Sequence, residues 1–167
     1  DHPIAIRDPK EPKRFPRGSV GILFDNVRFS YPERGTLVKR LNLEVPAGGV
    51  TALVGPTGGG KSTLANLALR YYEVDEGSVS VGGINLKDFA LEDLRGNIGI
   101  VSQDPFLFDA SVRENLLLAR PNASEEDLTK ALSAACALNF VNSLPEKLET
   151  MIGERGIRLS MGEKQRL

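Results

Sequence analysis

Hydrophobic and polar residues alternate in the first third of the chain, which is typical of strands that bury one face. The alternation runs over residues 22–29 and resumes over residues 41–45, with a proline-containing, turn-like segment at 32–36 between them. We predict two antiparallel strands joined by a turn, because only one register keeps the apolar side chains on a common face.

A strand, a glycine-rich loop and a helix are then predicted in succession. Residues 50–54 form a continuous apolar run of strand length, and residues 62–70 fit a helix with Leu64, Leu67 and Ala68 on one face. The glycine-rich segment lies between these two elements, and this order is the one in which phosphate-binding loops occur.

More sheet and a helical region are predicted further along. Residues 78–81 alternate, and residues 98–101 have the composition of a buried strand. Ser111 and Ser124 are predicted to cap helices, the second of which has acidic residues in its first turn. A helical stripe follows at Leu128, Ala131, Leu132, Ala135 and Leu138. We expect an α/β protein with a mixed sheet and a helical insertion from about residue 105 to 145.

Composition is that of a globular protein without a general attraction for polyanions. Of the 167 residues, 41% are hydrophobic and 26% charged, and the net charge is −1. No apolar run approaches the roughly 20 residues that span a bilayer. Because basic and acidic residues nearly balance, we expect no nucleic-acid partner, and any bound anion must be held by a local site.

Residues 1–19 are predicted to be a linker or tail, with a solvated tether favoured over a polyanion-binding arm. They contain the only histidine, His2, with several prolines and cations and without helical or strand periodicity. Cys136 is the only cysteine, so an intrachain disulfide and a cysteine-rich metal site are excluded. We interpret Cys136 as a small core residue.

The glycine-rich segment matches the phosphate-loop pattern G-x-x-x-x-G-K-S. Its residues are Gly55, Pro56, Thr57, Gly58, Gly59, Gly60, Lys61 and Ser62. Glycines let backbone N–H groups surround a polyphosphate, Lys61 is predicted to reach the β- and γ-phosphates, and the Ser62 hydroxyl to bind Mg²⁺. The loop alone does not distinguish an ATPase from a GTPase or a small-molecule kinase.

Beyond residue 20 the chain strongly resembles the nucleotide-binding domain of ATP-binding cassette (ABC) transporters, particularly the exporter type. The segments that carry the resemblance are residues 29–32 (FSYP), 100–108 (IVSQDPFLF), 111–115 (SVREN), 153–156 (GERG) and 159–166 (LSMGEKQR). It implies a P-loop NTPase fold over residues 20–167, with a RecA-like mixed-sheet core, an antiparallel β subdomain and an α-helical subdomain at about 105–160.

The resemblance also implies roles for single residues, with ATP and Mg²⁺ as the cofactors. Tyr31 corresponds to an aromatic residue that stacks on adenine, although a strand-end tyrosine at a turn is the alternative. Gln103 corresponds to a glutamine that contacts Mg²⁺ and the attacking water, where a solvated polar residue would otherwise be expected. Thr63 joins the nucleotide contacts, and Lys61 and Gln103 are the catalytic candidates.

The family signature, usually Leu-Ser-Gly-Gly-Gln, is altered here at Met161 and Glu163. In the family this segment begins a helix that grips the γ-phosphate of ATP on the opposite subunit, and Ser160 and Gly162 retain the hydroxyl and the small residue. Either the altered signature weakens this grip, or it is a tolerated variant. Residues 153–156 resemble a loop that contacts membrane domains in exporters, with a plain surface turn as the alternative; together with the apolar-aromatic segment 105–108 they favour an exporter.

The chain ends inside the helix that the signature begins, before the family's next motif. The family's aspartate-bearing strand, the glutamate that polarises the attacking water and the switch histidine have no counterpart in the sequence. We therefore expect a domain that is incomplete at its C-terminus, which binds ATP and Mg²⁺ but by itself hydrolyses ATP at a near-background rate.

The resemblance implies the ATP-hydrolysing motor domain of a membrane exporter. Its expected partners are a second nucleotide-binding domain, in a head-to-tail dimer, and the transmembrane domains of the transporter, at the cytoplasmic face of a membrane. A soluble ABC-type ATPase that acts on DNA or ribosomes is the alternative, but the balanced charge gives it little support. A small-molecule phosphoryl transferase would have no reason to carry the signature segment.

Overall fold

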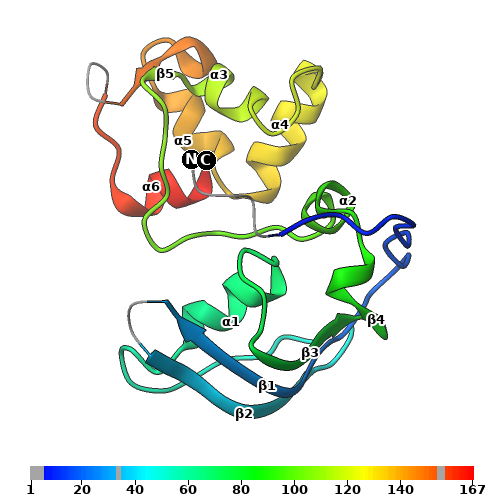
Figure 1. Ribbon diagram of the computed structural model, residues 1–167. Coiled ribbons are helices and arrows are strands. Elements are labelled where there is room, and N and C mark those ends of the chain that lie inside the picture. Colours follow the sequence, from blue (N-terminus) through cyan, green and yellow to red (C-terminus); the bar gives the residue numbers. More distant parts are fainter. Residues whose placement is uncertain (1–5, 33–34, 154–156) are drawn as a thin grey trace. The chain divides into compact units, whose positions relative to one another are not determined.

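A computed structural model describes residues 6–32, 35–153 and 157–167 of the chain. These residues form two compact units, of which the first ends at Gly99 and the second begins at Ile100 (Figure 1). The first unit contains the phosphate loop, and the second contains most of the helices.

An antiparallel sheet with the strand order β2-β1-β3-β4 forms the base of the first unit (Figure 1). Phe24 on β1 lies opposite Leu43 on β2 and Val79 on β3, so the alternating apolar residues share one buried face. The strands predicted around residues 22–29, 41–45 and 78–81 are therefore confirmed. The strands are β1 (Ile22–Tyr31), β2 (Gly35–Val45), β3 (Glu76–Val81) and β4 (Ile84–Asn85).

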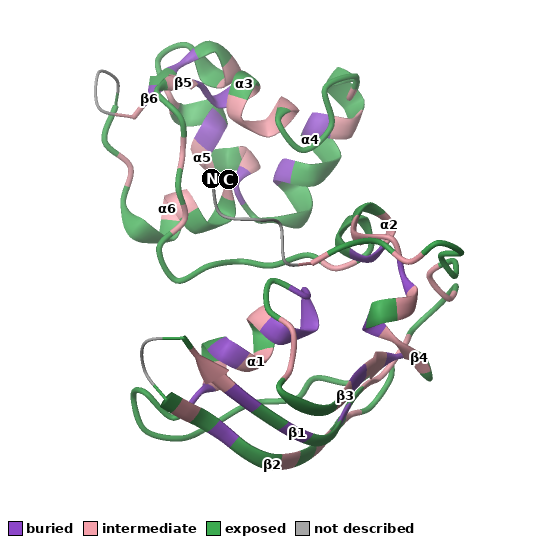
Figure 2. Cartoon of the chain, in the orientation of Figure 1, coloured by how far each residue is buried: buried purple, intermediate pink, exposed green. Residues whose placement is uncertain are grey.

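Helix α1 (Lys61–Ala68) covers this sheet, and the helix predicted over residues 62–70 is confirmed. Leu67 and Ala68 are buried in one cluster with the apolar residues of β1 and β3 (Figure 2). A 3-10 turn, η1 (Leu86–Asp88), and helix α2 (Leu91–Gly96) complete the cluster. Burial of this apolar face is the main stabilising contribution to the unit.

The C-terminus of α1 is closed by a Schellman motif with an unusual residue at its left-handed position. The Tyr71 N–H donates to the Asn66 carbonyl oxygen (2.9 Å), and the Arg70 N–H donates to the Leu67 carbonyl oxygen (3.0 Å). Arg70 has φ 52°, a conformation that glycine usually supplies and that costs other residues about 1–2 kcal/mol. Contacts of the arginine side chain must offset this cost.

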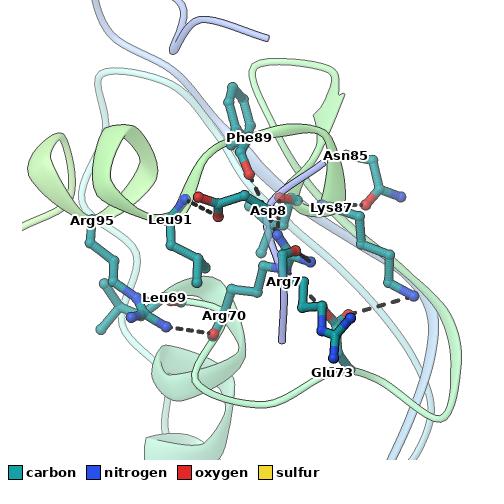
Figure 3. A network of polar contacts seen from close by, with 11 residues as sticks. Arg7, Asp8, Leu69, Arg70, Glu73, Asn85, Lys87, Phe89, Leu91 and Arg95 are labelled. Carbon is teal, nitrogen blue, oxygen red and sulfur yellow. Dashed lines mark hydrogen bonds and ion pairs between the residues drawn. The ribbon is translucent and has the colours of Figure 1, made fainter. Parts of the chain in front are cut away.

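The Arg70 guanidinium is buried and supplies these contacts (Figure 3). Its Nε donates to Glu73 Oε1 (2.8 Å), and one terminal nitrogen donates to the Arg7 carbonyl oxygen (3.2 Å). The other terminal nitrogen lies 3.5 Å from the carbonyl oxygens of Leu86 and Phe89. One side chain thus connects the end of α1 with η1 and with the N-terminal segment.

Residues 6–19 form no helix and no named strand, but they are held against the first unit rather than extending into solvent as their composition predicts. Asp8 accepts a hydrogen bond from the N–H of Leu91 at the start of α2 (2.9 Å), and the backbone N–H of Phe15 donates to Asp93 (2.7 Å). The Phe15 ring packs on Phe89 with the centroids 5.6 Å apart. The domain boundary at residue 20 stays a prediction.

Two predicted strands are not formed. Residues 50–54 and 98–101 have no strand assignment, and Val50, Val54 and Val101 are 103%, 90% and 74% exposed. A continuous apolar run is typical of a strand with neighbours on both sides. Among the described residues no named strand pairs with either run, so the parallel part of the expected mixed sheet is absent from the part of the chain that is described.

The second unit is helical, as predicted. Val112, Leu132, Ala137, Val141 and Ile152 form its buried core. Leu128 and Leu132 of the predicted stripe are buried, whereas Ala131 is exposed within α4 and Ala135 is exposed just beyond its end. The elements are β5 (Ala110–Ser111), α3 (Val112–Leu117), α4 (Glu125–Ala134), α5 (Leu138–Ser143), η2 (Lys147–Glu149), β6 (Met151–Ile152) and α6 (Met161–Arg166).

The predicted caps of α3 and α4 are confirmed, whereas the interpretation of Cys136 is wrong. Ser111 and Ser124 each form a reciprocal capping box, with Glu114 and Asp127 respectively. Cys136 is exposed and has φ 55°, because it takes the left-handed position that closes the C-terminus of α4. The helix end, rather than the apolar core, determines its place.

Arg70→Met should lower the free energy of unfolding by about 2–4 kcal/mol, because it removes the buried guanidinium that binds Glu73 and a buried carbonyl oxygen, and it leaves Glu73 only the longer pair with Lys87 (3.5 Å). Urea unfolding followed by circular dichroism measures the change. The control is Arg28→Met, since Arg28 pairs with Glu76 at the surface (2.8 Å, both side chains about half exposed) and should cost less than about 1 kcal/mol. Equal losses in the two variants would contradict the anchoring role of Arg70.

Candidate nucleotide-binding site

The phosphate loop lies directly before α1 and has the backbone shape that its glycines allow. Gly58 and Gly60 have φ of 81° and 84°, which is left-handed backbone, and the Gly59 N–H donates to the Pro56 carbonyl oxygen (3.1 Å). Gly60 is buried, and a Cβ on it would lie 3.7 Å from the side chains of Leu37 and Val38 on β2. The end of the loop therefore rests on the sheet.

Two glycines of the loop are bordered by open space. A Cβ placed on Gly55 or on Gly58 would meet no atom within 4 Å. The Lys61 ammonium, from the first residue of α1, donates to the carbonyl oxygens of Gly55 (2.9 Å) and Pro56 (2.7 Å). A cation, the N-terminus of an eight-residue helix and exposed loop backbone together suit a bound phosphate chain.

The hydroxyl side chains at the start of α1 differ in their surroundings. Ser62 is exposed in the first turn of the helix, where a hydroxyl oxygen is available to a hard cation such as Mg²⁺. Thr63 is buried, and its Oγ1 lies 3.3 Å from the Tyr31 hydroxyl. Tyr31, at the end of β1, is thus attached to the same helix that begins at the loop.

The rings around Tyr31 form a small aromatic cluster. Phe29 meets the Tyr31 ring nearly at right angles (centroids 4.8 Å apart, 83°), and so does Tyr72 (5.1 Å, 85°). Tyr72 comes from the turn after α1 and was not among the residues predicted from the sequence. The signal available in the sequence was the tyrosine pair that directly follows the predicted helix.

The signature segment begins α6, as expected, and Glu163 has a specific place in it. Ser160 caps the helix, and its N–H and hydroxyl both donate to Glu163 Oε2 (2.7 Å each), while the Glu163 N–H donates back to Ser160 Oγ (3.4 Å). The Ser160 hydroxyl and backbone N–H hold the pKa of Glu163 below its ordinary value. Met161 and Gly162 are exposed beside this capping box.

Gln103 belongs to the second unit, whereas the phosphate loop belongs to the first. Gln103 is exposed, and its backbone carbonyl oxygen, like that of Ser102, accepts a bond from the side-chain amide of Gln165 on α6 (3.3 and 3.4 Å). The segment around Gln103 is therefore attached to the signature helix. Its contact with Mg²⁺ stays a prediction.

A groove of about 720 Å³ in the second unit lies between the segment after Gln103 and the segment before α6. The exposed rings of Phe106 and Phe108 meet edge to face beside it (5.0 Å, 90°). Gly153 lies on the groove, whereas the rest of the predicted membrane-domain loop, residues 154–156, lies outside the described residues. The lining residues are Asp104, Pro105, Phe106, Leu107, Gly153, Ile157, Arg158, Leu159 and Lys164.

The described residues contain neither a metal-binding cluster nor a membrane-spanning helix. No cluster of three or more histidine, cysteine, aspartate or glutamate residues has an arrangement that would hold a metal ion there. None of the helices in the described part of the chain has the length and apolar character required to cross a bilayer.

The loop, its lysine and the helix that follows define a nucleotide-binding protein of the P-loop class, and comparison with known proteins identifies its family. The family description "ABC transporter" matches residues 38–167, so the chain belongs to the ABC transporter family. A solved structure of a bacterial Atm1-family ABC exporter with ATP bound is similar, with a TM-score of 0.89, 36% identity and coverage of 96% of this chain and 28% of that chain.

Curated relatives agree with this assignment. The uncharacterized ABC transporter ATP-binding protein YwjA of Bacillus subtilis (strain 168) is 44% identical over 97% of this chain. A protein of Staphylococcus aureus (strain NCTC 8325 / PS 47), named provisionally as a multidrug export ATP-binding/permease protein, is 43% identical over 94%. The chain spans 28% and 27% of the lengths of these relatives.

Ser160→Ala should raise the pKa of Glu163 toward the ordinary glutamate value of about 4.3, because both the hydroxyl donor and the geometry of the cap are lost. A carbon-13 NMR titration of the side-chain carboxyl measures this. Since the folded-state pKa is lowered, the capping box stabilises α6 above the ordinary pKa, and the stabilisation is lost as the pH falls through the lowered value.

The matched control in this titration is Glu114, which forms the same box with Ser111 and has a pKa lowered for the same reason. Ser160→Ala should leave its pKa where it is. An unchanged pKa of Glu163 in the variant would contradict the capping box as the cause of the shift.

Proposed function

We propose that this chain is the ATP-binding motor domain of an ABC exporter, in which ATP binding and hydrolysis drive export of a substrate across a membrane. The observation that carries the proposal is the open phosphate loop with Lys61 across it and Tyr31 attached to the following helix. A loop that can bind a polyphosphate and an aromatic ring on the same unit suit a purine nucleoside triphosphate.

In the proposed complex the loop residues 55–60 surround the phosphates of ATP and Lys61 neutralises charge on the β- and γ-phosphates. Ser62 and Gln103 are the proposed ligands of Mg²⁺, which would offset the charge of the phosphates. Thr63 adds a nucleotide contact, and Tyr31 stacks on adenine. These roles follow from the donor types and from the match to the family motifs.

The signature segment would contact ATP that is bound to a second nucleotide-binding domain in a head-to-tail dimer. Ser160 and Gly162 are both exposed at the start of α6, as a contact with another subunit requires. In the isolated chain the Ser160 hydroxyl donates to Glu163, so a phosphate from the partner would have to compete with that carboxylate. This competition supports a weakened composite site over a neutral variant.

The groove beside Phe106 and Phe108 is the proposed contact with the transmembrane domains of the exporter, at the cytoplasmic face of the membrane. Phe106 is 78% exposed, and Ile157 and Leu159 extend the apolar lining, with Arg158 and Lys164 at its polar side. Asp104 also lines this polar side, and exposed aromatic residues with a polar rim are typical of protein interfaces. The net charge and the named relatives do not favour a soluble ATPase that acts on nucleic acid.

Lys61→Ala should lower the affinity of the 167-residue chain for MgATP at least about tenfold, because the mutation removes the side-chain cation at the phosphates. Isothermal titration calorimetry with MgATP measures the affinity. Lys130→Ala is the matched control, since Lys130 forms a surface pair with Glu126 on α4, and it should bind MgATP like the unmodified chain. Equal binding by Lys61→Ala and the control would refute the assignment of the loop.

A further inference from the structure

The rings of Phe29, Tyr31 and Tyr72 come from two elements and meet at one place. Phe29 and Tyr31 lie on the same face of β1, two residues apart, and Tyr72 lies beyond the end of α1. Tyr72 contacts both of them, with its ring centroid 5.1 Å from that of Tyr31 and 5.6 Å from that of Phe29. The three rings thus contact one another, and two of them contact Tyr31 edge to face.

The position of Tyr72 is fixed by the turn that closes α1. The left-handed backbone at Arg70 reverses the chain, and the buried hydrogen bonds of Arg70 hold that turn (Figure 3). Glu73, the residue after Tyr72, accepts from Arg70 (2.8 Å) and pairs with Lys87 (3.5 Å). Tyr72 therefore lies between two anchored residues, although its own side chain is 40% exposed.

Tyr31 pairs through its backbone with Gly35 on β2 and packs against the buried core of the first unit. It is the last residue of β1 and is followed by Pro32, which donates no backbone hydrogen bond. Its hydroxyl contacts Thr63, and its ring contacts Phe29 and Tyr72. Each edge-to-face ring contact contributes about 0.5–1.5 kcal/mol beyond area burial, so loss of the contact with Tyr72 would weaken the restraint on the orientation of the Tyr31 ring.

We propose that Tyr72 is a positioning residue that holds the Tyr31 ring in the orientation that receives a purine base. Tyr72 acts through Tyr31 and needs no contact with the nucleotide. The inference rests on the proposed function, in which Tyr31 stacks on adenine. A ring that is already ordered loses less conformational freedom when the base binds, so the contact increases affinity for the base and not for the phosphates.

Tyr71 provides a matched control one residue away. It has the same ring and a similar exposure, 46%, but it lies against Arg95, whose guanidinium carbon is 4.9 Å from the ring centroid. No ring contact joins it to Tyr31 among the aromatic pairs of the described residues. A change at Tyr71 thus tests whether loss of any tyrosine from this turn has the same effect.

The experiment compares binding of MgATP with binding of magnesium tripolyphosphate, which has no base, to the 167-residue chain by isothermal titration calorimetry. Tyr72→Ala should weaken MgATP binding about five- to tenfold, because the Tyr31 ring loses one ring contact that orders it. Binding of tripolyphosphate should stay within about twofold of the value for the unmodified chain. Tyr72→Phe should restore MgATP affinity, because the phenyl edge remains, and Tyr71→Ala should change neither affinity.

A spectroscopic measurement follows the Tyr31 ring directly. The chain has three tyrosines and no tryptophan, so Tyr71→Phe combined with Tyr72→Phe leaves Tyr31 as the only strong fluorophore. The emission anisotropy of Tyr31 without nucleotide should be lower in Tyr71→Phe/Tyr72→Ala than in the double phenylalanine variant. An effect confined to stability would leave this anisotropy unchanged in the folded state.

The outcomes separate the inference from the function on which it rests. Equal weakening of MgATP and tripolyphosphate by Tyr72→Ala, or no change in either, would overturn the positioning role. Failure of the unmodified chain to bind MgATP would overturn the proposed function itself. Selective loss of MgATP affinity, rescue by phenylalanine and a more mobile Tyr31 would together establish Tyr72 as part of base recognition.

Discussion

The left-handed backbone at the two ends of α1 is the constraint on which the site depends. At the N-terminus, Gly60 takes this conformation and directs the loop over β2, so that Lys61 can reach back to the loop carbonyl oxygens. At the C-terminus, Arg70 takes it and directs the chain back toward β1. Glycine adopts it at little cost, whereas arginine needs buried hydrogen bonds as compensation. The helix therefore connects the phosphate grip with the aromatic cluster at Tyr31.

The parts of the fold that depend on local spacing were predictable from the sequence. Alternation at residues 22–29 indicates a strand of a sheet that buries one face. The order of the glycines, Lys61 and Ser62 predicts the phosphate loop and the helix after it. Ser111 and Ser124 were predictable as caps because the hydroxyl and the acid three residues later are both local. The expectation that Tyr31 stacks on adenine came from the family resemblance, because spacing alone does not give it.

The features that were not predictable depend on contacts that a local pattern does not specify. The apolar runs at 50–54 and 98–101 have the composition of buried strands, but a strand forms only where another strand accepts its hydrogen bonds, and the described residues provide none. Cys136 and Arg70 look like an apolar and a surface residue, respectively, yet helix closure places the thiol outside and the guanidinium inside. Tyr72 reaches Phe29 and Tyr31 because the left-handed backbone at Arg70 turns the chain.

Helices α3, α4 and α6 each begin with a capping box, in which a serine and an acid three residues later bond to each other, but the consequences of the box differ. At α3 and α4 the boxes with Glu114 and Asp127 serve the helix alone, whereas at α6 the box joins Ser160 to Glu163 in the segment that the family uses for a second nucleotide. A glutamine at 163 would offer the same hydroxyl a neutral acceptor. The acid therefore makes the helix start more stable and the exposed hydroxyl less available to an anion.

The claim that the backbone of the loop grips phosphate is tested most directly by the amide resonances of residues 58–62 in a proton–nitrogen correlation spectrum, recorded as MgATP is added to the chain. Hydrogen bonds from N–H groups to phosphate oxygens should move these amide protons downfield at saturation, while those of α4 stay in place. Saturable binding of MgATP that leaves the amides of residues 58–62 unshifted would contradict the account.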